Sequence, residues 1–81
     1  MLLAKSLAGH DKGKLYYVVS EDEGFVYLVN GKTKLLENPK RKKLMHVQLI
    51  KKLPDEITEM NIGDDSDIRK LLKAYSRETA E

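Results

Sequence analysis

The 81-residue sequence contains no cysteine and no tryptophan, and only five of its residues are aromatic. The lack of cysteine excludes disulfides, thiolate chemistry and cysteine-bound zinc, and it agrees with a cytoplasmic location. No apolar run is long enough for a membrane span, and the one at the start ends at Lys5, too short for a secretion signal. Because a chain of this length buries only about 60–65% of its unfolded surface, we expect one small domain without a large enclosed active site.

The residue combinations that carry catalysis are also missing. His10 and His46 lie in different predicted elements without an acidic residue at ligand spacing, and no glycine-rich loop precedes a helix as a P-loop requires. The acidic pairs at 55–56 and 64–65 fit a solvated linker and a helix N-terminus better than a metal site. We therefore expect a protein that is not an enzyme and that needs no metal or cofactor.

Positive charge is concentrated in the first two thirds of the chain. Residues 1–53 contain eleven Lys and Arg against five Asp and Glu, a net charge of +6, whereas residues 54–81 carry a net charge of −4. This distribution favours a polyanionic partner for the basic part, although charged side chains also keep any small protein in solution. The densest basic run, Lys40 to Lys43, is either a phosphate-binding cluster or a solvated loop.

A polar loop bracketed by glycines occupies residues 8–14. Gly9 and Gly13 permit positive φ or the close approach of another chain, and Asp11 is a turn former whose carboxylate can bind nearby backbone N–H groups. Three further positions can carry positive charge: His10, Lys12 and Lys14. The loop either offers cationic side chains and free backbone N–H groups to a phosphate, or it is a plain β-turn with solvated lysines.

Strand patterns dominate the rest of residues 1–53. Apolar, β-branched and aromatic runs predict strands at 1–7, 15–19 and 25–29, with a polar turn at 20–24. Asn30-Gly31 is a strong signal for a type I′ hairpin, so we expect a fourth strand over 32–36. Pro39 and the basic run that follows it indicate a loop or a strand edge.

Residues 44–50 alternate between apolar and polar side chains. This pattern predicts a last strand with Met45, Val47 and Leu49 toward the core and His46 and Gln48 facing outward. His46 is then either a hydrogen-bonding group beside the basic run or an ordinary surface histidine. Five short strands joined by tight turns suit a small SH3-like barrel, because closing a sheet removes most of its exposed edges.

The C-terminal part of the chain has helical periodicity. Ile68, Leu71, Leu72 and Tyr75 stand at i, i+3, i+4 and i+7, which predicts a helix over 64–77 that follows acidic N-capping residues. Because an isolated helix of this length is marginal in water, its apolar face either docks on the barrel or waits for a partner. We expect a barrel over 1–53, a connecting segment over 54–63 and a docked helix over 64–77, within one domain.

Four of the five aromatic residues lie on the strands predicted at 15–19 and 25–29. Since alternate residues of a strand face opposite sides, one pair belongs in the core. The other pair either stacks on bases or packs under the helix. Few aromatic side chains are left for single-stranded bases, so recognition of shape and phosphates is the expected mode of nucleic-acid binding.

The segment Gly9 to Lys14 (GHDKGK), between alternating strands near the N-terminus, resembles the KOW motif of ribosomal proteins and NusG-type transcription factors, with Gly13 at the motif's defining glycine. Residues 38–46 and 67–72 resemble segments of small bacterial KOW-domain proteins similar to the KOW-type large-subunit ribosomal proteins of eukaryotes and archaea. The resemblance covers most of the chain. It implies an SH3-like fold and binding to RNA, with ribosomal RNA or the ribosome as the expected partner.

If the loop and the basic run meet at one edge of the barrel, they form a basic rim that contacts RNA phosphates. The residues predicted for this basic rim are His10, Lys12, Gly13, Lys14, Lys40, Arg41, Lys42, Lys43 and His46. We expect a monomer with RNA as its partner. The alternative is an SH3-like module that binds proteins of transcription or translation. An exposed aromatic groove and binding that survives high salt would mark that alternative.

Overall fold

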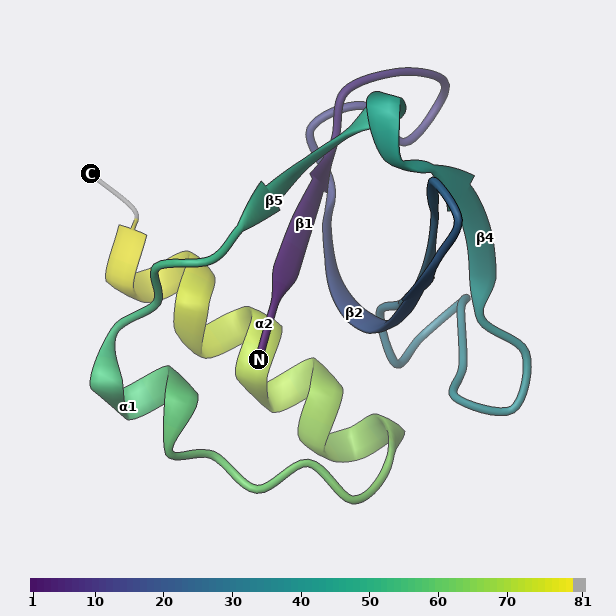
Figure 1. Ribbon diagram of the computed structural model, residues 1–81. Coiled ribbons are helices and arrows are strands. Elements are labelled where there is room, and N and C mark those ends of the chain that lie inside the picture. Colours follow the sequence, from purple (N-terminus) through teal and green to yellow (C-terminus); the bar gives the residue numbers. More distant parts are fainter. Residues whose placement is uncertain (80–81) are drawn as a thin grey trace.

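The computed structural model describes residues 1–79 and consists of a curved five-stranded antiparallel sheet with helices against one side (Figure 1). The strands are β1 (Leu3–Ser6), β2 (Leu15–Asp22), β3 (Phe25–Val29), β4 (Lys40–Lys43) and β5 (Val47–Ile50), in the order β4-β3-β2-β1-β5. A 3-10 turn, η1 (Leu44–His46), and the helices α1 (Asp55–Thr58) and α2 (Asp65–Thr79) complete the fold. The predicted mainly β class with a C-terminal helix is confirmed.

The sheet is curved but is not closed into the expected barrel. Its two edges are β4 and β5, and no backbone ladder joins them within the described part of the chain. η1 separates these two strands, which leave it in different directions in Figure 1. The register of β2 against β3 shifts between Val18 and Ser20, and such a bulge bends the strand that carries the extra residue.

The tight hairpin lies one strand earlier than the sequence predicts. Glu23 and Gly24 both have positive φ, 44° and 85°, as the two-residue type I′ turn between β2 and β3 requires. The side-chain Oδ1 of Asn30 instead accepts the backbone N–H groups of residues 32, 33 and 34, at 2.9 to 3.0 Å. The predicted strand over 32–36 is therefore wrong, because this local capping competes with strand pairing. β3 pairs with β4 instead.

The last strand also begins later than predicted. Residues 44–46 form η1, so the strand starts at Val47, and Met45 is 76% exposed instead of facing the core. Leu44 packs against the core in its place, together with Leu49. The 3-10 turn has a period of three residues, which breaks the alternation on which the prediction for Met45 depended.

Two apolar clusters hold the fold together. The first lies within the curve of the sheet and consists of Ala4, Tyr16, Val18, Val26, Leu28 and Val47. The second lies between the sheet and the helices and is centred on Leu3, Ile57 and Leu71, with Tyr17 at its margin. Ile57 belongs to α1, inside the segment for which the sequence predicted only a connection. The acidic residues after Pro54 were the available signal for this short helix.

α2 is capped at its start and apolar on its inner face. Asp64 Oδ1 accepts the N–H of Asp67 at 2.9 Å, as the side chain of an N-cap residue does, and Asp67 Oδ2 accepts the N–H of Gly63, the residue before the cap, at 2.9 Å. The hydrogen bond from Gly63 is the main reason why the pKa of Asp67 is lowered. Ile68 and Leu71 of the predicted apolar stripe are fully buried.

Candidate functional site

The loop between β1 and β2, residues 7–14, is shaped by its own backbone. Gly13 has a φ of 86° and donates its N–H to the carbonyl of Ser6 at 2.7 Å, while the N–H of Ser6 donates to the carbonyl of Lys14 at 3.0 Å. The N–H groups of Lys12 and Lys14 are bound by carbonyls within the loop. The expectation of free backbone N–H groups is therefore wrong for residues 12–14, so that a ligand here would be contacted by the side chains of Lys12 and Lys14.

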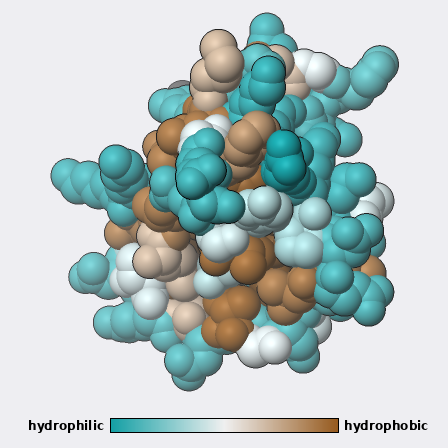
Figure 2. Space-filling model, turned by 45° about the vertical axis from the view of Figure 1, so that its right-hand side comes forward, coloured by the Kyte–Doolittle hydropathy of each residue, from teal (hydrophilic) through white to brown (hydrophobic). Residues whose placement is uncertain are grey.

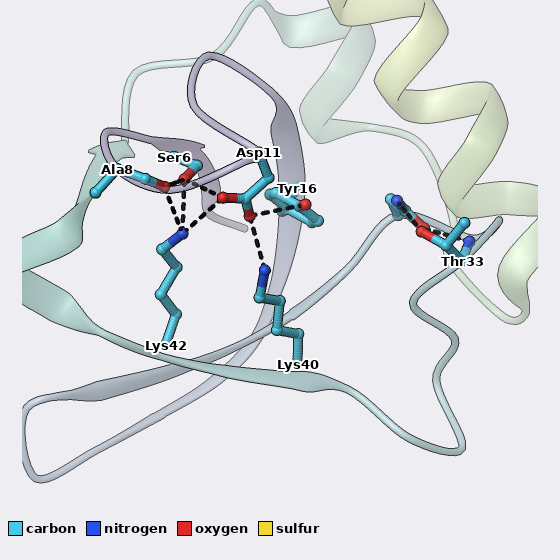
Figure 3. Close-up of polar contacts among 8 residues, drawn as sticks. Ser6, Ala8, Asp11, Tyr16, Thr33, Lys40 and Lys42 are labelled. Carbon is cyan, nitrogen blue, oxygen red and sulfur yellow. Dashed lines mark hydrogen bonds and ion pairs between the residues drawn. The ribbon is translucent and has the colours of Figure 1, made fainter.

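Asp11 turns its carboxylate inward, toward β4 (Figure 3). The residue is only 8% exposed. Its Oδ1 accepts hydrogen bonds from Ser6 Oγ at 2.9 Å and Lys42 Nζ at 2.8 Å. Its Oδ2 accepts from the Tyr16 hydroxyl at 3.0 Å and from Lys40 Nζ at 2.9 Å. We call these five side chains the Asp11 cluster.

β4 is a strand of four cations that alternates between the inside and the outside of the sheet. Lys40 and Lys42 rise toward Asp11 in Figure 3, whereas Arg41 and Lys43 are exposed, as the two-residue period of a strand requires. Lys42 Nζ donates three hydrogen bonds to groups of β1 and the loop, which uses all of its donors. Lys40 makes one such bond, and its side chain stays 33% exposed.

Opposing effects set the ionisation of the Asp11 cluster. Burial raises the pKa of Asp11, but hydrogen bonds from Lys42, Lys40, Ser6 and Tyr16 outweigh it and hold that pKa well below its ordinary value. Burial and the adjacent carboxylate raise the pKa of Tyr16 to about 12. Asp11 is therefore an anion and Tyr16 a neutral donor at ordinary pH, so that the cluster stays intact.

The fold brings the loop and the basic run together, but it does not turn all of their cations outward. Lys40 and Lys42 are bound by Asp11, and Gly13 shapes the loop. His46 is half-buried, and its carbonyl accepts the N–H of Leu7 at 2.9 Å. The exposed basic side chains of the predicted rim are His10, Lys12, Lys14, Arg41 and Lys43.

An apolar pocket lies beside the outward face of β4. The guanidinium carbon of Arg41 is 4.0 Å from the centre of the Phe25 ring, a cation–π contact. Next to this pair, an open pocket of about 530 Å³ is lined by Gly24, Phe25, Lys43, Leu44 and Met45. Figure 2 shows a face on which apolar surface is surrounded by hydrophilic side chains. The molecule thus offers both basic and apolar contacts to a partner.

Sequence reasoning missed the Asp11 cluster. Asp11 is the single acidic residue among residues 1–20, and this isolation in a basic segment was the one available signal. The partners could not be found in the same way, because Lys40 and Lys42 follow Asp11 at 29 and 31 positions along the chain. Only the pairing of β4 with β3 places them above the loop.

The described residues contain neither a metal-binding cluster nor a membrane-spanning helix. Among residues 1–79, no three His, Asp or Glu side chains gather closely enough to hold a metal ion. None of the described helices is long and apolar enough to cross a membrane. A scan of protein-family models finds no match to this chain, and a search of curated proteins finds none either.

Proposed function

We propose that this chain is a non-catalytic RNA-binding protein that contacts phosphates through the β1–β2 loop and the outer face of β4. One observation carries the proposal: the Asp11 cluster fixes the loop against β4, so that basic side chains from two distant segments lie side by side. Segments 7–14 and 40–43 contain six Lys and Arg and one acidic residue. Five positive charges remain after Asp11 is offset, and such an excess favours phosphate binding through counterion release.

The rigidity of the Asp11 cluster supports the proposal. Lys40 and Lys42 are held at 2.9 and 2.8 Å from the carboxylate, and buried pairs are screened by salt much less than exposed ones. A loop that is already ordered loses less conformational freedom when it binds. The exposed side chains of Lys12 and Lys14 therefore project from a fixed backbone.

The resemblance of residues 9–14 to the KOW motif points in the same direction. Gly13 stands at the motif's defining position and has a φ of 86°, a conformation that glycine adopts without strain. We propose that the curved sheet is of the SH3-like type and that ribosomal RNA or the ribosome is the partner. A cytoplasmic monomer is the form we expect to bind it.

A protein-interaction module is the second candidate function. The observation that favours it is the apolar pocket beside Phe25, where Met45 is 76% exposed. Exposed apolar side chains of this kind are common at protein interfaces. Binding of a protein there depends on apolar area and is expected to survive high salt, whereas phosphate binding is not.

Fluorescence anisotropy with a labelled RNA hairpin tests the proposal. Lys12→Glu and Arg41→Glu are each expected to weaken binding about tenfold near ~100 mM salt, and to reduce the slope of log affinity against log salt by about one unit. Lys51→Glu makes the same charge change at an exposed residue outside the rim and serves as the matched control. Circular dichroism verifies that each variant is folded.

Two results would count against the proposal. An RNA affinity that does not depend on salt would remove the phosphate contacts and favour the protein-interaction candidate. Equal losses for Lys51→Glu and Lys12→Glu would show that only the total charge matters, and that the β1–β2 loop is not the binding surface.

A further inference from the structure

The outer face of α2 forms one wall of an open groove of about 1000 Å³, and most of the residues that line this groove lie outside the basic rim. The opposite wall comes from the end of the β1–β2 loop and from the segment after β3. Five lining residues are cationic: Lys14, Lys32, Arg69, Lys70 and Lys73. Among residues 1–79, no Asp or Glu lines this groove. We call it the α2 groove.

The α2 groove is a fixed feature, because its walls are bonded to each other. A guanidinium N–H of Arg69 donates to the carbonyl of Gly31, and Asp65 Oδ1 accepts the N–H of Leu36 at 2.9 Å. A Cβ at Gly31 would lie 2.4 Å from the carbonyl oxygen of Asp65, so the two backbones are in close contact. The segment after β3 is therefore held against the first turns of α2.

In the part of the chain that the structure describes, no cation of α2 forms a side-chain ion pair with a carboxylate. Within the described residues, the side-chain ion pairs are the two made by Asp11. Arg69 and Lys73 stand four apart on the helix, where like charges repel by a few tenths of a kcal/mol. Asp67 stands three positions before Lys70 on the helix, and the charge of Lys70 makes a minor contribution to the lowered pKa of Asp67. The fold thus maintains a like-charged surface that an external anion would stabilise.

We infer that the α2 groove binds the phosphodiester backbone of the same RNA, an inference that rests on the proposed function. Lys14 belongs both to the basic rim and to the groove, so the two surfaces are continuous. Cations from three chain segments suit a chain of phosphates rather than one phosphate, and hydroxyl groups in the groove add donors of the kind that bind phosphate oxygens. These hydroxyls belong to Thr33, Ser66 and Ser76.

Other anions fit this shape less well. A free nucleotide is usually held in a more enclosed cleft that buries most of its surface, whereas this groove is open and wide. An anionic membrane favours a helix that exposes a broad apolar face to the lipid, but the apolar face of α2 is buried against the sheet. A concave, cationic surface accommodates a negatively charged polymer, and RNA is the polymer that is already proposed to bind the basic rim.

The experiment compares two double variants of the full chain in their binding to a labelled RNA hairpin. Lys70→Ala/Lys73→Ala removes two groove cations, and Lys51→Ala/Lys52→Ala removes two exposed cations outside the groove. We expect the groove variant to bind about tenfold or more weakly near ~100 mM salt, with a salt slope lower by about two units. The control variant should lose much less. Alanine favours the helix, so α2 should remain folded.

The possible results distinguish a failure of the α2 groove inference from a failure of the proposed RNA-binding function. If Lys12→Glu weakens binding but the groove variant matches its control, the groove is not part of the interface and the proposed function stands. If the wild-type protein does not bind the hairpin at all, both fall. If the groove variant loses binding to poly-glutamate or to phosphatidylserine vesicles as much as to RNA, the assignment of RNA as the occupant is overturned.

Discussion

Lysines have opposite roles in the Asp11 cluster and in the α2 groove. The side chain of Lys42 is 11% exposed and all three of its donors are bound to the protein, whereas Lys70 and Lys73 are exposed beside other cations. The difference lies in whether the fold supplies an anion. A count of basic residues cannot distinguish the two cases, because the same residue type stabilises the fold in one region and is available to a ligand in the other.

The energetic consequences of the two regions differ as well. Removing one member of a buried ion pair leaves a charge without solvent or partner, which costs several kcal/mol. Removing an exposed cation changes the free energy of unfolding very little, since exposed charges are already solvated. Substitutions in the Asp11 cluster should therefore alter stability first, and substitutions in the α2 groove should alter binding first.

Asp11→Asn is expected to have the largest effect. The variant keeps the shape of the side chain but leaves Lys40 and Lys42 without their anion, so the free energy of unfolding should fall by about 3–5 kcal/mol. Urea denaturation followed by circular dichroism measures the change. Asp22→Asn makes the same substitution at an exposed position and should leave stability nearly unchanged. Similar stabilities for the two variants would contradict the role given to the buried carboxylate.

The effect of Asp11→Asn should also depend on pH. The pKa of Asp11 in the folded protein lies below its ordinary value, which is about 3.9 in an unfolded chain. The stability contributed by its charge is therefore present above about pH 4 and is lost as the pH falls through the lower, folded pKa. The difference in melting temperature between wild type and Asp11→Asn should narrow on acidification. A difference that stays constant would mean that the charge is not what stabilises the loop.

Gly31→Ala and Gly13→Ala make the same substitution at two glycines with positive φ, one packed against α2 and one in the β1–β2 loop. At Gly31, φ is 75° and the added Cβ would lie 2.4 Å from the carbonyl oxygen of Asp65, whereas at Gly13 φ is 86° and the Cβ would meet no atom within 4 Å. We expect Gly31→Ala to cost about 3 kcal/mol, from steric overlap and backbone strain together, and Gly13→Ala about 1 kcal/mol from strain alone. Equal costs in urea denaturation would contradict the close contact between the segment after β3 and α2.

Lys42→Met and Lys70→Met make the same substitution at a lysine bound by Asp11 and at an exposed lysine of the α2 groove, and so test whether the two lysines have different roles. Lys42→Met keeps the aliphatic stem but removes the ammonium group bound by Asp11, so we expect a loss of about 2 kcal/mol in the free energy of unfolding. Lys70→Met should change it by less than about 0.5 kcal/mol. Thermal unfolding of both variants in the same buffer gives the comparison. A Lys70→Met protein as unstable as Lys42→Met would mean that Lys70 has a structural partner.

The sequence predicts the elements whose signals are local. The apolar runs of β2 and β3 and the helical spacing from Ile68 to Tyr75 are repeated over enough residues to identify each element. β4 was left undecided between a loop and a strand edge, because four consecutive cations resemble a solvated segment. In the structure β4 pairs with β3, and its two inward lysines are bound by Asp11, which comes from another part of the chain.

The candidate site was predictable to a similar extent. The sequence identified the loop and the basic run as two cationic segments, and the structure shows that they lie together. It did not reveal that half of the run faces inward, since that depends on the register of β4 against β3. The α2 groove was also missed, because its cations come from Lys14, Lys32 and α2, which only the docking of the helix brings together.

Tyr16→Phe is expected to have a smaller effect than Asp11→Asn, Gly31→Ala or Lys42→Met, and it tests the one member of the Asp11 cluster that also belongs to an apolar cluster. It removes a single hydrogen bond of 3.0 Å to the carboxylate, and hydrogen bonds to charged groups contribute about 1.5 kcal/mol or somewhat more.

The pKa of Tyr16 is raised to about 12, above the unfolded value of about 10. The stability due to its proton is therefore present below about pH 10 and is lost as the pH rises toward 12. Wild type should lose this stability in alkaline solution, whereas Tyr16→Phe should not. Ultraviolet absorbance of wild type should show one tyrosine that ionises at a higher pH than the others, and this transition should be missing from Tyr16→Phe. Tyr27→Phe, outside the cluster, is the control. If Tyr27→Phe flattened the alkaline profile as much as Tyr16→Phe, the hydrogen bond to Asp11 could not be its cause.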